Sequence, residues 1–218
     1  MKKIWNAEQK LCFERALQER GAGLIAGADE AGRGPLAGPV VCAAVILPLD
    51  AASLIEGVDD SKKLSEAARE RLDGYIRARA LAFAVCEESS ETIDRINILE
   101  ATKLCMKRAV EALDPPPSAV LVDGDLRIDV ACAQQSIVGG DALSYSVGAA
   151  SILAKVYRDA RMREYDKLYP QYGFAVHKGY GTKRHIDAIR EFGLCAIHRR
   201  TFTKKFWAGA GNAAPPNS

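Results

Sequence analysis

At 218 residues, with 48% hydrophobic and 27% charged residues, the chain is long and apolar enough for one medium-sized domain with its own core. No apolar run reaches the roughly 18 residues that a membrane-spanning helix requires, and charged residues from Glu8 to Arg15 interrupt the stretch that a signal peptide would need. These features exclude an integral membrane protein, and we expect a protein of the cytoplasm that contacts no membrane.

Charge is divided unevenly along the chain. Residues 1–150 hold 17 Lys and Arg against 23 Asp and Glu, whereas residues 151–218 hold 13 against 5. An acidic body followed by a basic C-terminal third suits a polyanionic ligand that lies beside a cluster of carboxylates. Chance clustering on a solvated surface explains the asymmetry equally well, so charge alone does not establish nucleic-acid binding.

The six cysteines occur singly, and no pair has the C-x-x-C spacing of a metal site. Cys42, Cys86 and Cys132 lie among apolar neighbours, which predicts buried and reduced thiols. We therefore expect neither a zinc site nor a disulfide.

Apolar periodicity predicts the elements in chain order. In the first half, helices are expected over 5–17, from Ser65 to about 76, and over 91–113, and strands over 24–28, 39–47 and 81–86. In the second half, strands are expected over 119–122 and 137–138, and helices over 145–168 and, after a loop at 177–181, over 182–192.

Three strands at the front, followed by alternating helices and strands, predict an α/β fold in which helices flank both faces of a mixed five-stranded sheet. We expect one domain over 1–205, whose part from about 170 to 205 is a small, basic helical C-terminal extension, and a disordered tail over 206–218. Sheets of this kind place functional groups at strand ends and in the loops beyond them.

Two adjacent carboxylates, Asp29 and Glu30, follow the first strand directly. The glycines around them invite comparison with a phosphate-binding loop, but Arg33 stands in place of the lysine and Gly34 in place of the hydroxyl residue. In a regular strand the two carboxylates would face opposite sides, and we expect the glycines to bend the backbone so that both serve one site. A hard cation such as Mg²⁺ or Mn²⁺ would offset their repulsion. The alternative is a solvated acidic turn.

Two further acids occupy comparable positions. Asp123 ends the apolar run 119–122 and precedes Gly124, and Asp125 competes with it for a role in the site. Asp141 follows two glycines and precedes the long helix. The pattern around Asp141 favours a helix N-cap, with Ser144 as a rival for that position.

On the long helix, Lys155 and Asp159 are four residues apart and predict an ion pair on one face. Asp159 is a further, weaker candidate for a metal ligand. The three histidines, His177, His185 and His198, are not at ligand spacing, and we interpret them as surface or phosphate-adjacent residues. Serine hydrolase chemistry lacks support, because no strand is followed by G-x-S-x-G.

Six blocks of the sequence, taken together and in order, resemble the type 2 ribonuclease H family, and most closely its ribonuclease HII branch. They contain the strings GADEAGRGP, DSKKL, VDG, AASILAKV with RD, PQYGF leading to HKGY, and HRRTF, and they span roughly residues 22–203. One block alone would be a weak signal, whereas six in the family's order are highly specific.

The resemblance implies a ribonuclease H-like fold and an endonuclease that hydrolyses the RNA strand of RNA–DNA hybrids. It further implies cutting 5′ of ribonucleotides embedded in duplex DNA, which leaves 3′-hydroxyl and 5′-phosphate ends, with two Mn²⁺ or Mg²⁺ ions during catalysis. The catalytic and metal-binding residues would be Asp29, Glu30, Asp123 and Asp141, which replaces the capping role for Asp141.

The resemblance also assigns substrate contacts. Gly32, Arg33 and Gly34 would meet the 2′-hydroxyl and the adjoining phosphate, and Tyr180 would stack on the sugar. Lys62 and Lys155 are weaker candidates for phosphate contact or support of the site. Basic residues of the last third would grip the nucleic-acid backbone; they are Lys178, Lys183, Arg184, Arg199, Arg200, Lys204 and Lys205.

Two small departures from the family pattern concern Asp125, where asparagine is frequent, and Gly148, where alanine is frequent. Asp125 adds negative charge near the expected metals and so bears on metal affinity. Two other functions remain open at this point, a non-catalytic binder of RNA–DNA hybrids and a metal-dependent DNA nuclease on the same fold. We expect a monomer, and the tail contains no clear motif for docking to a replication clamp.

Overall fold

The computed structural model describes residues 7–207. Its centre is a five-stranded sheet with the strand order β3-β2-β1-β4-β5. β1 pairs antiparallel with β2, as β2 does with β3, whereas the pairs β1–β4 and β4–β5 are parallel. The predicted mixed five-stranded sheet is therefore confirmed. The strands are β1 (Ile25–Ala31), β2 (Val40–Ile46), β3 (Ala82–Glu88), β4 (Ala119–Asp123) and β5 (Ala133–Ile137).

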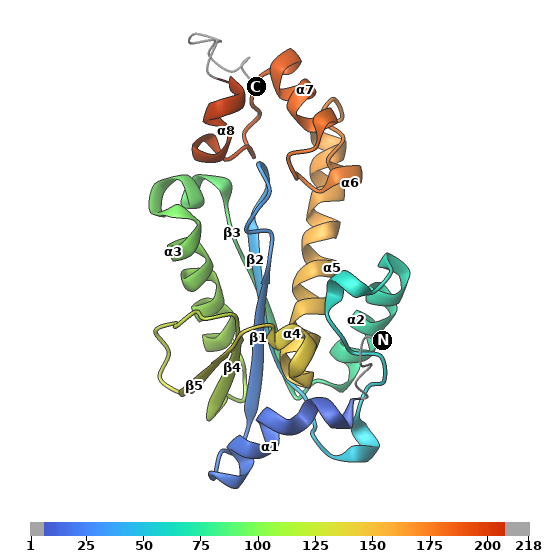
Figure 1. Ribbon diagram of the computed structural model, residues 1–218, viewed down its shortest axis with the longest axis vertical. Coiled ribbons are helices and arrows are strands. Elements are labelled where there is room, and N and C mark those ends of the chain that lie inside the picture. The colour runs from blue at the N-terminus through green and yellow to red at the C-terminus, as the bar shows by residue number, and fades with distance from the viewer. Residues whose placement is uncertain (1–6, 208–218) are drawn as a thin grey trace.

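Helices cover both faces of the sheet, α3 on one and α5 with α2 on the other, while α6, α7 and α8 gather near the C-terminal end of α5 (Figure 1). The predicted helical extension is thus present. Within residues 7–207, no helix is long and apolar enough to cross a membrane. The α-helices are α1 (Cys12–Glu19), α2 (Glu66–Arg79), α3 (Ser90–Glu111), α4 (Gly140–Leu143), α5 (Tyr145–Leu168), α6 (Phe174–His177), α7 (Lys183–Phe192) and α8 (Arg200–Trp207), and the 3-10 turns are η1 (Glu8–Leu11), η2 (Ala51–Ser53) and η3 (Ser61–Lys63).

The sequence misplaced one strand and missed one interruption. β5 is an edge strand that begins at Ala133, earlier than predicted. The prediction missed its start because the residues there are mostly polar and at least partly exposed, so they give no apolar pattern. α3 is broken at Asn97, whose φ of 67° is not helical. The Asn97 side chain accepts hydrogen bonds from the N–H groups of Leu99 and Glu100, at 2.9 and 3.1 Å, and so caps the second part of the helix.

The predictions for the two ends of the chain fall only partly within the described residues. The tail predicted over 206–218 begins too early, because Phe206 and Trp207 belong to α8. The rest of that segment, like the first two residues of the helix predicted over 5–17, lies outside the described residues. All six cysteines are free; Cys42 is buried as predicted, whereas Cys86 and Cys132 are only half-buried.

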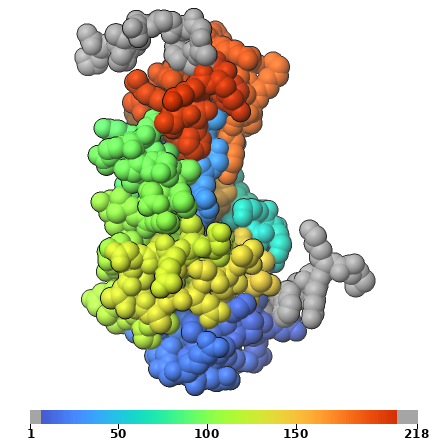
Figure 2. All heavy atoms as spheres, turned by 60° about the vertical axis from the view of Figure 1, so that its left-hand side comes forward, coloured from blue at the N-terminus to red at the C-terminus, as the bar shows by residue number. Residues whose placement is uncertain are grey.

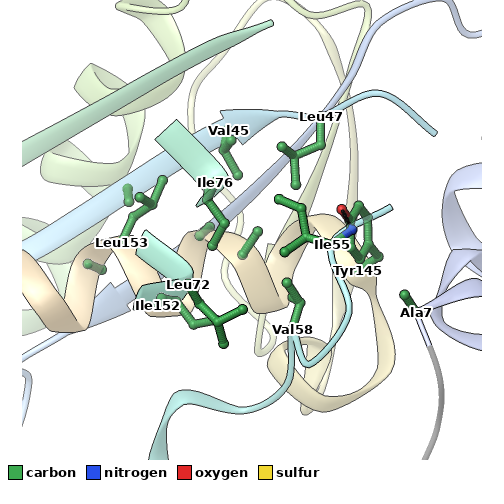
Figure 3. Close-up of a cluster of buried hydrophobic side chains, with 14 of the residues drawn as sticks. Ala7, Val45, Leu47, Ile55, Val58, Leu72, Ile76, Tyr145, Ile152 and Leu153 are labelled. Carbon is green, nitrogen blue, oxygen red and sulfur yellow. Dashed lines mark hydrogen bonds between the residues drawn. The ribbon is translucent and has the colours of Figure 1, made fainter. Parts of the chain in front are cut away.

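β2 is buried along its whole length and divides the core in two. One set of its side chains packs with α2 and α5, as the close-up in Figure 3 shows around Val45, Ile76 and Leu153. The alternate set, Cys42, Ala44 and Ile46, packs against Cys105, Met106 and Ala109 of α3. This alternation explains why the strand is a continuous apolar run rather than a mixed one.

A separate cluster of buried side chains joins the C-terminal helices to the end of α5. It contains Met162 of α5, Tyr172, Phe174, Ile189 and Ile197. Seen with all atoms as spheres, the C-terminal segment forms one end of the molecule, against the segment that contains α3 (Figure 2). The helical extension therefore has an apolar base of its own and is fixed to the sheet domain through α5.

α5 lies unusually close to β1, and Gly27 makes this possible. A Cβ atom at Gly27 would lie 2.1 Å from the carbonyl carbon of Ser146 in the first turn of α5. Because real Cβ atoms do not approach backbone that closely, a side chain at this position must displace the helix from the strand.

We predict that Gly27→Ala lowers the free energy of unfolding by at least about 2 kcal/mol, since overpacking against backbone has no flexible neighbour to yield. Gly74→Ala is the control. Gly74 is exposed on α2 and a Cβ there meets nothing within 4 Å, so this change should stabilise the protein by about 0.5–1 kcal/mol. Urea unfolding measures both. Equal stabilities for the two variants would contradict the close packing of α5 on β1.

Candidate active site

The parallel pairing of β1 with β4 brings two of the acids together. Ala28 is opposite Val122 in the sheet, so Asp29 and Asp123 follow at the same edge. The predicted backbone bend at Asp29 and Glu30 is wrong. β1 continues through both residues, which pair with Ala43 and Cys42 of β2, because these backbone groups are held by the antiparallel ladder. Gly32, with φ at 95°, turns the chain only after the strand.

Asp141 lies in the first turn of α4, the short helix between β5 and α5, and comes close to Asp123. Its backbone N–H donates to Oδ1 of Asp123 at 3.4 Å. The N-cap of α5 is Ser144, whose side chain accepts from the N–H of Val147 at 3.2 Å, so the capping role that the local pattern favoured for Asp141 is wrong. Gly148 contributes through its size, since a Cβ there would lie 2.9 Å from the carbonyl oxygen of Asp141. The glycine that departs from the family pattern thus permits this close approach.

The carboxylates disfavour one another's ionised form. Burial, followed by the charges of Glu30 and Asp123, raises the pKa of Asp29 well above its ordinary value. The pKa of Glu30 is raised by burial, opposed by Arg33 and reinforced by Asp123. The pKa of Asp141 is raised by burial, then by Asp60 and Asp123. Asp123 therefore acts on the other three candidate ligands.

Basic side chains face part of this negative charge. Nη1 of Arg33 lies 3.4 Å from Oε1 of Glu30, and Nζ of Lys62 lies 3.4 Å from Oδ2 of Asp141. The second oxygen of Glu30, Oε2, is buried without a hydrogen-bond partner. An orphaned carboxylate oxygen among acids of raised pKa fits a hard divalent cation, which prefers oxygen ligands. Over residues 7–207, however, no three Asp, Glu, His or Cys side chains are arranged to hold one metal ion.

A cleft of about 210 Å³ opens beside these acids. Glu30 of the acidic cluster lines it, and so do all six residues that the family resemblance assigned to substrate contact, Gly32, Arg33, Gly34, Lys62, Lys155 and Tyr180. Tyr180 is 47% exposed, which leaves its ring available to a ligand. Asp29, Asp123 and Asp141 do not line the cleft itself.

Asp159 is engaged elsewhere. The predicted Lys155–Asp159 ion pair is present at 2.6 Å, and Nη2 of Arg69 lies 3.5 Å from the second oxygen of Asp159. Arg69 also donates to the carbonyls of Ser61 and Leu64, at 3.0 and 2.6 Å. Asp159 therefore balances two cations and holds Lys155 at the edge of the cleft.

Two buried arginines were missed as parts of the site. Arg199, which we expected among the surface residues that grip nucleic acid, is 0% exposed, and Arg158 is 1% exposed. Among the described residues, neither lies within ion-pair distance of a carboxylate, and both donate to backbone carbonyls around the Gly32–Pro39 turn or to that of Lys178. Burial lowers the pKa of Arg199 to about 9 and that of Arg158 to about 10. Arg199 and Arg200 are adjacent in the string HRRTF, and the local sequence does not reveal that Arg199 is buried while Arg200 is exposed.

The histidines are also buried, so their interpretation as surface residues is wrong. His185 and His198 face each other, with 3.0 Å between their Nε2 atoms. Nδ1 of His185 lies 2.9 Å from the carbonyl oxygen of Tyr180, and Nδ1 of His198 accepts from the N–H of Cys195 at 2.9 Å. The pair thus ties the backbone of Tyr180 to the turn before α8. The aromatic cluster around Tyr172 and Phe174 encloses both rings.

This burial predicts a pH-dependent stability. Burial and the neighbouring His185 lower the pKa of His198 from 6.5 to about 3. The stability that the neutral His198 side chain contributes is therefore fully present above pH 6.5 and is lost as the pH falls toward 3. The free energy of unfolding should drop by about 2 kcal/mol from this residue between pH 7 and pH 5, because only the unfolded state takes up the proton.

Urea unfolding at the two pH values tests the prediction on the wild type and His198→Gln. The variant should lose less stability on acidification, whatever its stability at pH 7. An equal loss in both proteins would show that the His198 side chain does not carry the effect.

The fold is that of the ribonucleases H, as two solved structures show. The ribonuclease H2 of Pyrococcus horikoshii OT3 superposes with a TM-score of 0.73 at 25% identity, over 85% of this chain and 98% of that chain. Bst-RNase HIII, solved in complex with Mn²⁺, gives a TM-score of 0.66 at 24% identity over 85% of this chain and 69% of that chain, which supports the fold alone.

The family follows from closer relatives. The family model for Ribonuclease HII matches residues 26–209. Ribonuclease HII of Ruminiclostridium cellulolyticum is 52% identical over 91% of this chain and 77% of its own length, and that of Geobacter sulfurreducens is 55% identical over 87% of each. The chain belongs to the ribonuclease HII family, and it is an endoribonuclease that acts on RNA–DNA hybrids.

Proposed function

We propose that this enzyme also cuts DNA duplexes on the 5′ side of a single embedded ribonucleotide, and that all its products carry 3′-hydroxyl and 5′-phosphate ends. The observation that carries the proposal is the composition of the cleft. Glu30, from the cluster of acids, and the Gly32–Gly34 turn with Tyr180 line the same cavity. This one cleft can therefore contact the scissile phosphate and the neighbouring 2′-hydroxyl at the same time.

We propose that Asp29, Glu30, Asp123 and Asp141 hold divalent cations, Mn²⁺ or Mg²⁺, two of them during catalysis. Such ions, when bound, supply positive charge at the phosphate and make the attacking water more acidic. The raised pKa values of Asp29, Glu30 and Asp141 support this role, because carboxylates in that state gain most from a nearby cation. No side chain of this set needs to act as a nucleophile.

Selectivity for RNA would come from the turn after β1. The 2′-hydroxyl is the group by which a protein distinguishes RNA from DNA at one position. Gly34 leaves open space, since the nearest atom to a Cβ there is Cε1 of Tyr180 at 3.9 Å. Backbone groups of the turn can thus approach the sugar, the Tyr180 ring can stack on it, and Arg33 can hold a phosphate through its planar fork.

Lys62 and Lys155, which also line the cleft, would contact phosphates there. The C-terminal helices offer further basic groups to the nucleic-acid backbone, and affinity should fall as salt rises. We propose that the protein works as a monomer in the cytoplasm. The exposed basic residues of α7 and α8 are Lys183, Arg184, Arg190, Arg200, Lys204 and Lys205.

We predict that Asp29→Asn or Asp123→Asn abolishes cleavage of a duplex with one ribonucleotide, by about 10³-fold or more, while binding of that duplex changes little. Loss of one carboxylate removes charge that the transition state requires but leaves the substrate-contacting walls intact. Cleavage rates in Mn²⁺ and binding measured by fluorescence anisotropy give the two readouts.

The matched control is Asp125→Asn, which makes the same chemical change two residues away at an exposed side chain. It should retain cleavage. DNA duplexes with no ribonucleotide and with several complete the assay. Absence of cutting by the wild type would favour a hybrid-binding protein, and equal cutting of the all-DNA duplex would favour a DNA nuclease.

A further inference from the structure

Arg199 is a fully buried cation whose hydrogen-bond acceptors among the described residues are all backbone oxygens. Its Nη2 donates to the carbonyl of Gly32 at 2.6 Å, its Nη1 to that of Arg33 at 2.8 Å, and its Nε to that of Gly38 at 3.0 Å. Burying a guanidinium without an acid is unfavourable unless its donors are well satisfied. The side chain is thus committed to fixing the shape of this turn.

The two bonds from the fork determine where the next N–H groups point. In a planar trans peptide the C=O and the following N–H are directed oppositely. With the carbonyls of Gly32 and Arg33 held inward by Arg199, the N–H groups of Arg33 and Gly34 must point away from it. Within residues 7–207, neither N–H donates to a protein acceptor. Both residues are exposed and line the cleft.

Arg158 shows that this function belongs to Arg199 in particular. Arg158 is equally buried, but its donors go to the carbonyls of Ala37, Pro39 and Lys178. Its side chain packs against Gly32 but makes no hydrogen bond to the carbonyls of Gly32 and Arg33. Only the Arg199 fork spans the two consecutive carbonyls whose orientation decides the direction of the exposed N–H pair.

We propose that Arg199 is a positioning residue for ribonucleotide recognition. By holding two consecutive carbonyls on the inner side of the turn, it aims the N–H groups of Arg33 and Gly34 at the oxygen of the 2′-hydroxyl and the adjoining phosphate. Preorganised donors bind without first having to be ordered. This inference rests on the proposed function, which it deepens by naming the group that prepares the site for a 2′-oxygen.

The test compares binding of two duplexes, identical except for one ribonucleotide, with Ca²⁺ in place of Mn²⁺ so that cleavage does not interfere. The ratio of the two dissociation constants measures discrimination. Arg199→Lys should lower this ratio by about tenfold, the factor that corresponds to one well-aligned hydrogen bond. A lysine keeps the charge but has no planar fork to hold both carbonyls.

The control for stability is Ile76→Ala, which removes buried volume from the cluster that β2, α2 and α5 form, a cluster that contains no residue of the Gly32–Pro39 turn. It should lower the unfolding temperature and leave the ratio unchanged. A wild-type ratio near one would overturn the proposed function itself. A clear wild-type ratio that survives in Arg199→Lys would overturn only the role of Arg199.

A measurement on the wild type covers the case in which Arg199→Lys does not fold. A hydrogen bond from the Arg33 or Gly34 N–H polarises its peptide and strengthens the bond that the carbonyl accepts from Arg199. The side-chain N–H resonances of Arg199 should therefore shift on binding the ribonucleotide-containing duplex and shift less with the all-DNA duplex. Equal shifts with both duplexes would contradict the proposal.

Discussion

Repulsion among carboxylates that the backbone forces together is the constraint on which the site depends. The parallel register of β1 and β4 fixes Asp29 beside Asp123. α5 packs closely on Gly27 of β1, and Asp141 lies against Gly148 of α5, which holds Asp141 close to the other two acids. Because these positions are set by sheet pairing and helix packing, the acids cannot separate to relieve their repulsion. Their electrostatic repulsion can be reduced by protonation, by a basic neighbour or by a bound cation.

Beside the acidic cluster, buried side chains hold the backbone of the neighbouring turn and of Tyr180 through hydrogen bonds. Arg199 and Arg158 satisfy the carbonyls of the turn after β1, and the His185–His198 pair holds the backbone of Tyr180. Asp29, Glu30 and Asp123 are thus carried by the sheet and Asp141 by α4, whereas the residues that would contact a ribonucleotide are held by contacts from the C-terminal part of the chain. This division explains why the helical extension, with an apolar cluster of its own, is part of the site rather than an appendage.

The sequence alone was enough to predict elements with a regular apolar repeat and acidic residues at the ends of strands. It predicted α5 with its observed bounds, the mixed sheet and the acid that ends β4, because apolar periodicity and strand-terminal acids are local signals. It failed where a residue's partner is distant in the chain. The burial of Arg199 and His198 depends on carbonyls and rings brought by tertiary packing, and β5 has too few apolar residues to mark it. Asp141 joined the candidate site through family resemblance, since its local pattern indicated a cap.

The central claim is that the acidic residues repel one another in the folded protein and that a bound cation relieves this repulsion. Thermal unfolding of the wild type and Asp29→Asn with and without Mn²⁺ tests it most directly. Without metal, the variant should unfold at a higher temperature, because it lacks a buried charge of raised pKa. Mn²⁺ should raise the unfolding temperature of the wild type by more than that of the variant. Identical unfolding temperatures without metal, together with equal shifts on adding Mn²⁺, would contradict the account.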